Sequence, residues 1–265
     1  MGEISPLPDP AAEGHGQRRS AETPADPPTA LVLAELRARL QERARVPDLG
    51  AGWRHQSAML PALGVAYGGD FVISAQPAEG EHVQLVLVDT CGHGESAVPA
   101  ALQLAGALQG LLSVVPPAGV LAAANTFLLS QPSGESIATA VQVEIDLVTG
   151  DYVVRSAGHP PALRLVGASG EFVVDHARGT ALGVHDAPEF VESCGRLEPG
   201  ECLLFYTDGV VEERGSDIDA GIDWLRRAAR SALAEGWEGA ADRILAGVAS
   251  GEDDRAVLLL QRTPH

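Results

Sequence analysis

The sequence has little cysteine, and the cysteines it has do not form recognisable pairs. Its 265 residues include three cysteines, Cys91, Cys194 and Cys202, and no Cys-x-x-Cys motif. We therefore expect neither a disulfide-stabilised scaffold nor a structural zinc site. The chain also lacks an uninterrupted apolar run of membrane-spanning length and a basic-then-apolar N-terminal signal pattern. These absences predict a cytoplasmic protein with no transmembrane segment.

Basic residues are also scarce. Lysine and arginine together number 18 against 36 aspartates and glutamates, which gives a formal net charge of −18. Because a chain this acidic repels phosphate backbones and anionic lipid headgroups, nucleic acids and membranes are not expected partners. An excess of carboxylates does suit divalent cations. A P-loop motif is missing, and Ser96 lacks the Gly-x-Ser-x-Gly context of a serine hydrolase nucleophile.

The composition divides the chain into three parts. Residues 1–28 are rich in Pro, Ala, Gly and charged residues and nearly free of large apolar side chains, so we expect a disordered tail. Residues 29–48 begin with a leucine-containing helical pattern that Thr29 caps and Pro47 ends, which predicts a linker helix that could also pair two copies of the chain. Residues 49–265 read as one folded domain.

The domain mixes strand-like and helix-like patterns. Short β-branched and leucine-rich runs separated by Gly and Asp predict strands, several of them in hairpins, while long Ala- and Leu-rich runs predict helices. This mixture indicates an α+β protein in which helices cover mostly antiparallel sheets. The expected strands span 82–89, 137–146, 151–157, 162–166, 171–174, 202–207 and 255–261, and the expected helices span 95–112, 219–234 and 238–249.

Aspartates recur where the predicted strands meet loops. Asp89 ends one strand, Asp208 follows another, Asp253 and Asp254 precede the last, and Asp70 precedes a short apolar run. Any one of these acids could be ordinary turn chemistry, because Asp and Gly are common in turns. Together they could converge on one edge of a sheet, where carboxylates would bind Mg²⁺ or Mn²⁺. The spacing alone thus suggests a metal site without fixing its chemistry.

The motifs around these acids resemble the SpoIIE-like branch of the PP2C (PPM) phosphatases. The resemblance extends over roughly residues 50–262, in family order, and it is specific because several weak motifs occur together. The motifs are Gly68-Gly69-Asp70-Phe71, Asp89-x-x-Gly92-His93-Gly94, Ser156-Ala157-Gly158-His159-Pro160-Pro161, Thr180-Ala181-Leu182-Gly183-Val184, Pro199-Gly200, Thr207-Asp208-Gly209-Val210-Val211-Glu212 and Asp253-Asp254.

The resemblance implies a four-layer α-β-β-α sandwich with two Mn²⁺ or Mg²⁺ ions at one end of its paired sheets. Carried over to this sequence, Asp89 would bridge both ions, and the carbonyl of Thr90 and the carboxylate of Asp70 would bind one of them. Asp208 and Asp253 would bind the other ion. Asp254 is adjacent, and its role could be exchanged with that of Asp253.

The activity implied is hydrolysis of phosphoserine or phosphothreonine by a water that the two metals activate. Asp89 and Asp208 are the acids on which this catalysis would depend most. His93 is a candidate acid for the leaving oxygen, and a structural role for it is equally open. His159, in its Gly-His-Pro-Pro turn, is expected to organise the turn and not to bind metal.

Two departures from the family pattern stand out. Val72, Ile73 and Ser74 follow Phe71 where many relatives have an aromatic residue and a second aspartate, which weakens the case for an outer, water-mediated metal contact. Thr90 and Cys91 replace the more usual valine and small or methionine residue before Gly-His-Gly, which puts Cys91 near the expected metals. We expect it to be a small buried filler residue, with oxidation sensitivity as the alternative.

The leading hypothesis is therefore a bacterial signalling enzyme, a metal-dependent protein serine/threonine phosphatase. Its substrate would be a phosphorylated regulatory protein, and the resemblance suggests a STAS-type anti-anti-sigma factor. The alternative is a catalytically weak or inactive regulatory domain that keeps the fold and binds a partner. Such a domain would be expected to lose metal aspartates, whereas all of them are present here. A small-molecule phosphoesterase would need a deep substrate pocket.

Overall fold

The computed structural model describes most of the predicted domain and little of the chain before it. The tail expected over 1–28 lies outside the described residues, and of the linker helix expected over 29–48 only Val32 and Glu35, both helical and exposed, and residues 46–48 lie within them. The described residues are 32, 35, 46–62, 69–76, 80–91, 97–131, 137–167, 169–212, 217–248 and 253–263.

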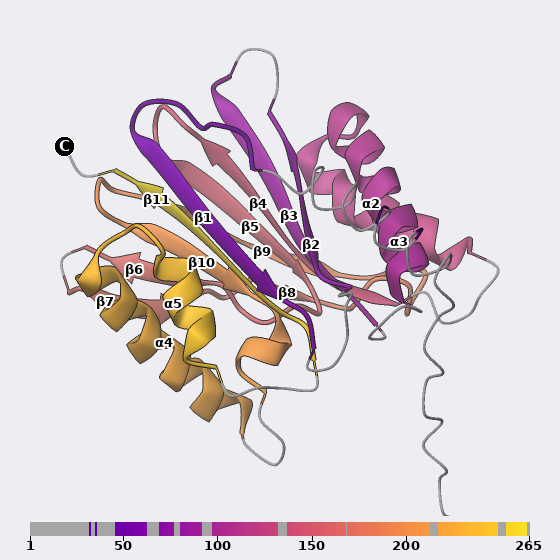
Figure 1. Cartoon of the computed structure of the whole chain (residues 1–265). Helices are drawn as coiled ribbons and strands as arrows, with labels where there is room; N and C mark the ends of the chain where they lie inside the picture. The colour runs from indigo at the N-terminus through magenta and orange to yellow at the C-terminus, as the bar shows by residue number, and fades with distance from the viewer. Residues whose placement is uncertain are drawn as a thin grey trace, which may run out of the picture.

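Two β-sheets form the centre of the molecule (Figure 1). All of the paired strands within them run antiparallel. The five-stranded sheet has the order β1 (Trp53–Leu60), β11 (Arg255–Arg262), β10 (Cys202–Tyr206), β6 (Leu163–Val166) and β7 (Glu171–Val174). The six-stranded sheet has the order β2 (Phe71–Ala75), β3 (His82–Thr90), β4 (Ala138–Asp146), β5 (Asp151–Ala157), β9 (Phe190–Arg196) and β8 (Arg178–Gly179).

Helices cover the outer face of each sheet, as Figure 1 shows. Side chains from α2 (Ala97–Val114) and α3 (Val120–Leu129) pack on the six-stranded sheet. Those from α4 (Ile218–Glu235) and α5 (Ala240–Ala246) pack on the five-stranded sheet. Single-turn 3₁₀ helices at Pro117–Gly119 and Asp208–Val210 complete the elements. The α+β, α-β-β-α sandwich expected from the resemblance is confirmed.

The apolar strands are continuous because both of their faces are buried. In β11, Ala256, Leu258 and Leu260 face the core between the sheets, whereas Val257 and Leu259 face the helices. The strand pleat sends successive side chains to opposite faces, so a strand covered on both sides needs an apolar residue at nearly every position. This two-sided burial explains why the sequence predicts β3, β10 and β11.

Several elements differ from the expectations. The helix expected over 238–249 is shorter, Ala240–Ala246. The structure also adds α3, β1, β2, β8 and β9, for which the sequence predicted no ranges. Most β9 side chains are exposed or half-exposed, so the strand carries little apolar signal. It exists because its backbone pairs with β5 from Asp151↔Arg196 to Arg155↔Glu192. None of the described helices is both long and apolar enough to cross a membrane.

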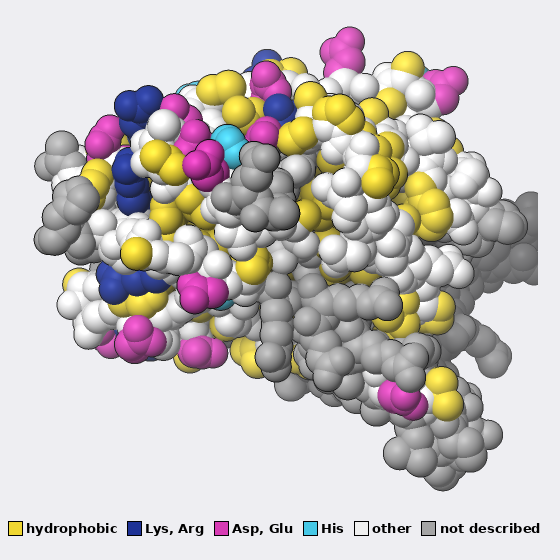
Figure 2. All heavy atoms as spheres, turned by 90° about the horizontal axis from the view of Figure 1, so that it is seen from above, with side chains coloured by type: hydrophobic (Ala, Val, Ile, Leu, Met, Phe, Trp, Pro, Cys, Tyr) yellow, Lys and Arg dark blue, Asp and Glu magenta, His cyan; other side chains and the backbone are white. Residues whose placement is uncertain are grey.

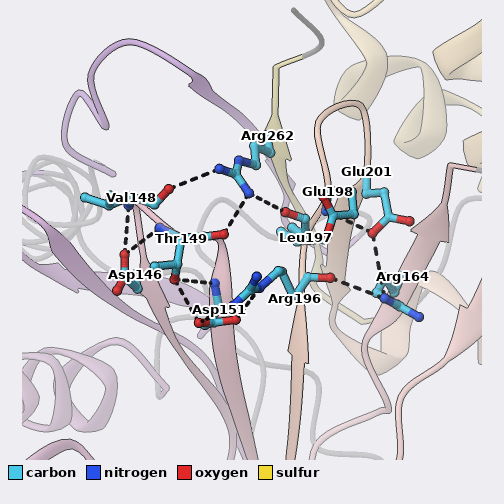
Figure 3. Close-up of polar contacts among 10 residues, drawn as sticks. All are labelled: Asp146, Val148, Thr149, Asp151, Arg164, Arg196, Leu197, Glu198, Glu201 and Arg262. Carbon is cyan, nitrogen blue, oxygen red and sulfur yellow. Dashed lines mark hydrogen bonds and ion pairs between the residues drawn. The ribbon is translucent and has the colours of Figure 1, made fainter.

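At one end of the sandwich, Arg262 joins the two sheets (Figure 3). From the end of β11 its guanidinium donates to the carbonyls of Thr149 (2.8 Å) and Val148 (3.0 Å) in the β4–β5 turn, and to that of Leu197 (3.0 Å). Beside it, Arg196 and Asp151 form a two-point ion pair at 2.6 and 3.0 Å. Acidic and basic side chains are accordingly interspersed on the face seen in Figure 2.

We expect Arg262→Ala to lower the free energy of unfolding by about 1–3 kcal/mol, because three carbonyl groups lose a charged donor. Arg227→Ala is the matched control, since the Nε of this exposed arginine bonds only within its own helix, to the carbonyl of Asp223. That control should change stability by less than about 0.5 kcal/mol. Urea denaturation measures both variants, and equal stabilities would contradict a clamping role for Arg262.

Candidate metal centre

The first pair of candidate acids comes from neighbouring strands of the six-stranded sheet. Phe71 of β2 pairs with Val88 of β3. Asp70 precedes Phe71 and Asp89 follows Val88, so the two acids lie side by side at the same end of these antiparallel strands. Leu87 faces the core between the sheets and Val88 faces α2 and α3, so the alternation turns Asp89 toward the opposite sheet. The two carboxyl groups share a side-chain hydrogen bond.

The second group of acids comes from the five-stranded sheet. Tyr206 of β10 pairs with Val257 of β11, and beyond that pair the amide of Thr207 donates to the carbonyl of Ala256 at 3.1 Å. Asp208 therefore leaves β10 at the same edge where residues 253 and 254 lead into β11. Asp253 is exposed, Asp208 is partly buried and Asp254 is buried.

Hydrogen bonds across the sandwich join the two groups. The hydroxyl of the fully buried Thr207 donates to Oδ2 of Asp70 at 2.8 Å and accepts the amide of Ala256 at 2.8 Å. The carboxylate of Asp254 accepts two amides from the segments that precede β2, that of Ala62 at 2.9 Å and that of Gly69 at 2.6 Å. The edge is thus one connected structure built from both sheets.

Gly209 makes the close approach of the β10 and β11 ends sterically possible. A Cβ at this position would clash with the carbonyl oxygen of Asp254, so only glycine fits there. The Asp208-Gly209 dipeptide therefore does more than form a turn. The glycine brings the backbone after Asp208 directly against the backbone of Asp254, and with it the two acid-bearing loops.

Burial and mutual repulsion govern the charges of these acids. Burial, then the carboxylates of Asp208 and Asp253, raise the pKa of Asp89 to about 7. Burial and the neighbouring Asp253 and Glu212 raise the pKa of Asp208 to about 6. The pKa of Asp70 also lies well above its usual value, from burial first and the charge of Asp89 second. Protons here partly replace the counter-charge that a cation would supply.

The donor set fits a hard divalent cation in composition. Carboxylate oxygens are the ligands that Mg²⁺ and Mn²⁺ prefer, and their raised pKa values show that positive charge is electrostatically favoured at this edge. Within the described ranges, no three or more His, Cys, Asp or Glu side chains are already arranged to hold a metal ion. Asp70, Asp89, Asp208 and Asp253 are the side chains that would hold such a cation, and its binding would be favoured when they are ionised.

Comparison with known proteins places this chain in a family. Residues 79–263, more than half of the chain, match the family described as stage II sporulation protein E (SpoIIE). The chain belongs to the SpoIIE family. It is 30% identical over 139 residues to the phosphoserine phosphatase RsbP of Bacillus subtilis (strain 168), covering 50% of this chain and 34% of RsbP. The matched region thus spans about a third of that relative's length.

Solved structures agree with this assignment. The RsbU and RsbW domains of Rv1364c from Mycobacterium tuberculosis superpose with a TM-score of 0.68 at 26% identity, covering 81% of this chain and 61% of that one. The PP2C phosphatase domain of SpoIIE from Bacillus subtilis gives 0.66 at 20% identity, covering 79% and 63%. The serine/threonine protein phosphatase PstP, solved with two manganese ions, gives 0.58 at 16% identity, covering 80% and 98%. The fold is that of PP2C-type phosphatases.

Three further candidates from the SpoIIE-like motifs have different outcomes. Thr90 is buried, and its hydroxyl donates to the carbonyl of Gly69 at 3.1 Å, which ties β3 to the segment before Asp70. Cys91 is exposed, so the expectation of a buried filler is wrong. Desolvation and the nearby carboxylates, Asp89 first among them, raise the pKa of its thiol. His93 lies outside the described residues.

His159 is buried within the sandwich. Its Nδ1 lies 2.8 Å from Oγ1 of Thr139, and its carbonyl accepts the hydroxyl of Ser156 at 3.1 Å. Burial lowers the pKa of His159 to about 3, so the ring is neutral in the working range of pH. These contacts agree with the turn-organising role expected for the histidine.

The sequence motifs did not reveal every residue that shapes this edge. Thr207 and Thr139 had no assigned role, although each bonds a motif residue. Glu212 was quoted only as part of a motif, yet its charge raises the pKa of Asp208. Thr207 had one available signal, its position immediately before Asp208 at the end of a buried strand. Thr139 had none, because its partner is distant in sequence.

We expect the metal-free chain to lose stability as pH rises through about 7. The pKa of Asp89 is raised on folding from 3.8 to about 7, so its favourable contribution is complete below pH 3.8 and is lost above pH 7. Asp89→Asn should therefore be more stable than the unsubstituted chain at pH 8 in chelator, by about 2 kcal/mol, and this difference should shrink toward pH 5.

Urea denaturation at the two pH values measures this difference. Asp186→Asn is the control, because the side chain of Asp186 is 91% exposed and lies outside the acid cluster. If Asp89→Asn were no more stable than that control at pH 8, the crowding of carboxylates inferred here would be wrong.

The contact between the sheets gives another prediction. Thr207→Val keeps the side-chain shape but removes the hydroxyl that bonds Oδ2 of Asp70 and the amide of Ala256, which should cost about 2–3 kcal/mol of stability. Thr207→Ser keeps the hydroxyl and should retain most of it. Thermal and urea unfolding compare the two variants, and a valine variant as stable as the serine variant would refute the proposed importance of these bonds.

Proposed function

We propose that this chain is a metal-dependent protein serine/threonine phosphatase that hydrolyses phosphoserine or phosphothreonine on a regulatory protein. The observation that carries the proposal is the gathering of Asp70, Asp89, Asp208, Asp253 and Asp254 at one edge of a PP2C-type sandwich. Membership of the SpoIIE family and similarity to a phosphoserine phosphatase support the reaction class.

The cofactors would be two Mn²⁺ or Mg²⁺ ions. Asp89 would lie between them, Asp70 and the carbonyl of Thr90 would serve one ion, and Asp208 and Asp253 the other. Bound ions would supply an acidified water as the nucleophile and offset the charge of the phosphoryl oxygens. The manganese ions of PstP, a protein of the same fold, support this choice of cofactor.

The hydrogen bonds favour Asp253 over Asp254 as a direct ligand. Both oxygens of Asp254 accept backbone amides, and its side chain is buried. Asp253 is exposed, although one of its oxygens accepts the amide of Asp254 at 2.8 Å. These contacts support a proposed division of roles, in which Asp254 holds the segment before Asp70 and Asp253 binds the cation.

Hydrogen bonds and raised pKa values would set how these acids meet a cation. Thr207 fixes one oxygen of Asp70, and Asp70 bonds the side chain of Asp89. The raised pKa values of Asp89 and Asp208 mean that protons compete with the cation below about pH 6–7. Metal-dependent activity should therefore fall as the solution becomes more acidic through that range.

The substrate and partners are proposed from chemistry and family. RsbP is named a phosphoserine phosphatase. We propose that the substrate of this chain is a phosphorylated regulatory protein of the STAS type. A homodimer through the helix expected over residues 29–48 is proposed as a further partner arrangement. We also propose a cytoplasmic location, which suits both the substrate class and the free cysteines Cys91, Cys194 and Cys202.

The decisive test is hydrolysis of a phosphoserine peptide with and without Mn²⁺. We expect Mn²⁺-dependent turnover, and a loss of about 100-fold or more in Asp208→Ala and Asp208→Asn, because each removes a ligand charge. Asp186→Asn, an exposed acid outside the site, is the matched control and should keep its activity.

Two outcomes of this assay would reject the assignment. Near-normal turnover by the Asp208 variants would remove that residue from the metal site. A chain that binds Mn²⁺ but turns over no phosphopeptide would instead be the catalytically inactive regulatory domain considered as the alternative.

A further inference from the structure

We propose that Thr139 and His159 form a positioning pair for Asp89. The buried ring of His159 fixes the hydroxyl of Thr139, and Thr139 in turn borders the space in which the Asp89 carboxylate lies. The inference rests on the function proposed above and adds to it two residues outside the set of candidate ligands. Neither residue would touch the substrate, so both would act through Asp89.

The strand register places Thr139 beside Asp89. The two residues are direct partners in the pairing of β3 with β4. Side chains of antiparallel partners project from the same face, with Cβ atoms about 4.5–5.5 Å apart. Val141, two residues along β4, faces the core between the sheets, whereas Ala138 and Ala140 face α2 and α3. Thr139 therefore shares with Asp89 the face that looks toward the other sheet.

His159 fixes this threonine from the interior of the sandwich. Its Nδ1 lies 2.8 Å from Oγ1 of Thr139, its residue is only 6% exposed, and its ring also contacts the backbone of Tyr206. Tyr206 immediately precedes Thr207, which bonds Asp70. The ring thus lies between the strand beside Asp89 and the strand that leads to Asp208.

A fixed neighbour matters because Asp89 lies among several other carboxylates. Carboxylates of Asp208, Asp253 and Asp254 all act on it, and their repulsion would turn a loosely held side chain toward solvent. Groups that orient metal ligands from behind commonly change metal affinity or activity by about 10–100-fold when they are removed. The pair of Thr139 and His159 would hold the ligand geometry in place before any cation binds.

The test compares isosteric and conservative variants of both residues. Thr139→Val keeps the side-chain shape and removes the hydroxyl, while Thr139→Ser keeps the hydroxyl. His159→Phe removes both ring nitrogens, whereas His159→Asn keeps a polar atom near the place of Nδ1. Thr126→Val, on the exposed face of α3, is the control for loss of a threonine hydroxyl.

Mn²⁺ affinity by titration calorimetry, kcat and KM on the phosphoserine peptide, and thermal unfolding are measured for each variant. We expect Thr139→Val and His159→Phe to bind Mn²⁺ about 10-fold more weakly and to lower kcat with little change in KM. Thr139→Ser and His159→Asn should stay within about threefold of the unsubstituted chain. The double variant Thr139→Val/His159→Phe should lose no more Mn²⁺ affinity and kcat than the more impaired of the two single variants, because both residues act through one contact.

The outcomes separate this inference from the proposed function. If the unsubstituted chain neither bound Mn²⁺ nor turned over the peptide, the proposed function would fail and this inference with it. If it did both and a folded Thr139→Val variant kept its Mn²⁺ affinity and kcat, the positioning pair alone would be overturned. Should His159→Phe fail to fold, Thr139→Val and Thr139→Ser still decide the matter.

Discussion

The structure depends on bringing like charges together at the edge where two sheets meet. Five aspartates gather there, and their mutual repulsion and burial raise the pKa of Asp89 to about 7 and that of Asp208 to about 6. Such an arrangement opposes folding unless neutral groups hold it in place. Thr207 and the backbone amides of Ala62 and Gly69 do so, by bonding Asp70 and Asp254.

The two ends of the sandwich show the contrast between stability and function. At the far end, Arg262 bonds three carbonyls and Arg196 pairs with Asp151, so charges there are neutralised locally. At the aspartate edge, burial and the carboxylates of Asp208 and Asp253 instead raise the pKa of Asp89 to about 7. Carboxyl groups whose pKa values are raised in this way mark a functional site more strongly than the presence of acids alone.

Much of this architecture could be predicted from the sequence, because buried strands leave a strong pattern. β3, β10 and β11 are apolar on both faces, and this pattern marks the acids at their ends as candidate site residues. β9 escaped prediction because its side chains are mostly exposed and only its backbone pairing makes it a strand. Cys91 is exposed where a buried residue was expected, because local sequence does not fix the burial of a residue just beyond the end of a strand.

The contacts that organise the site were beyond reach for a different reason. Thr207 bonds Asp70 across 137 positions, Asp254 bonds Gly69 across 185, and Thr139 lies 20 residues from His159. None of these pairs has a spacing that a local pattern could reveal. The first two exist only when the two sheets stack, and the third forms only when β4 pairs with β5. A family motif marks which residues gather, whereas the neutral partners that make the gathering tolerable follow from the fold. Substitutions of those partners would therefore alter the proposed metal site without changing any of its acids.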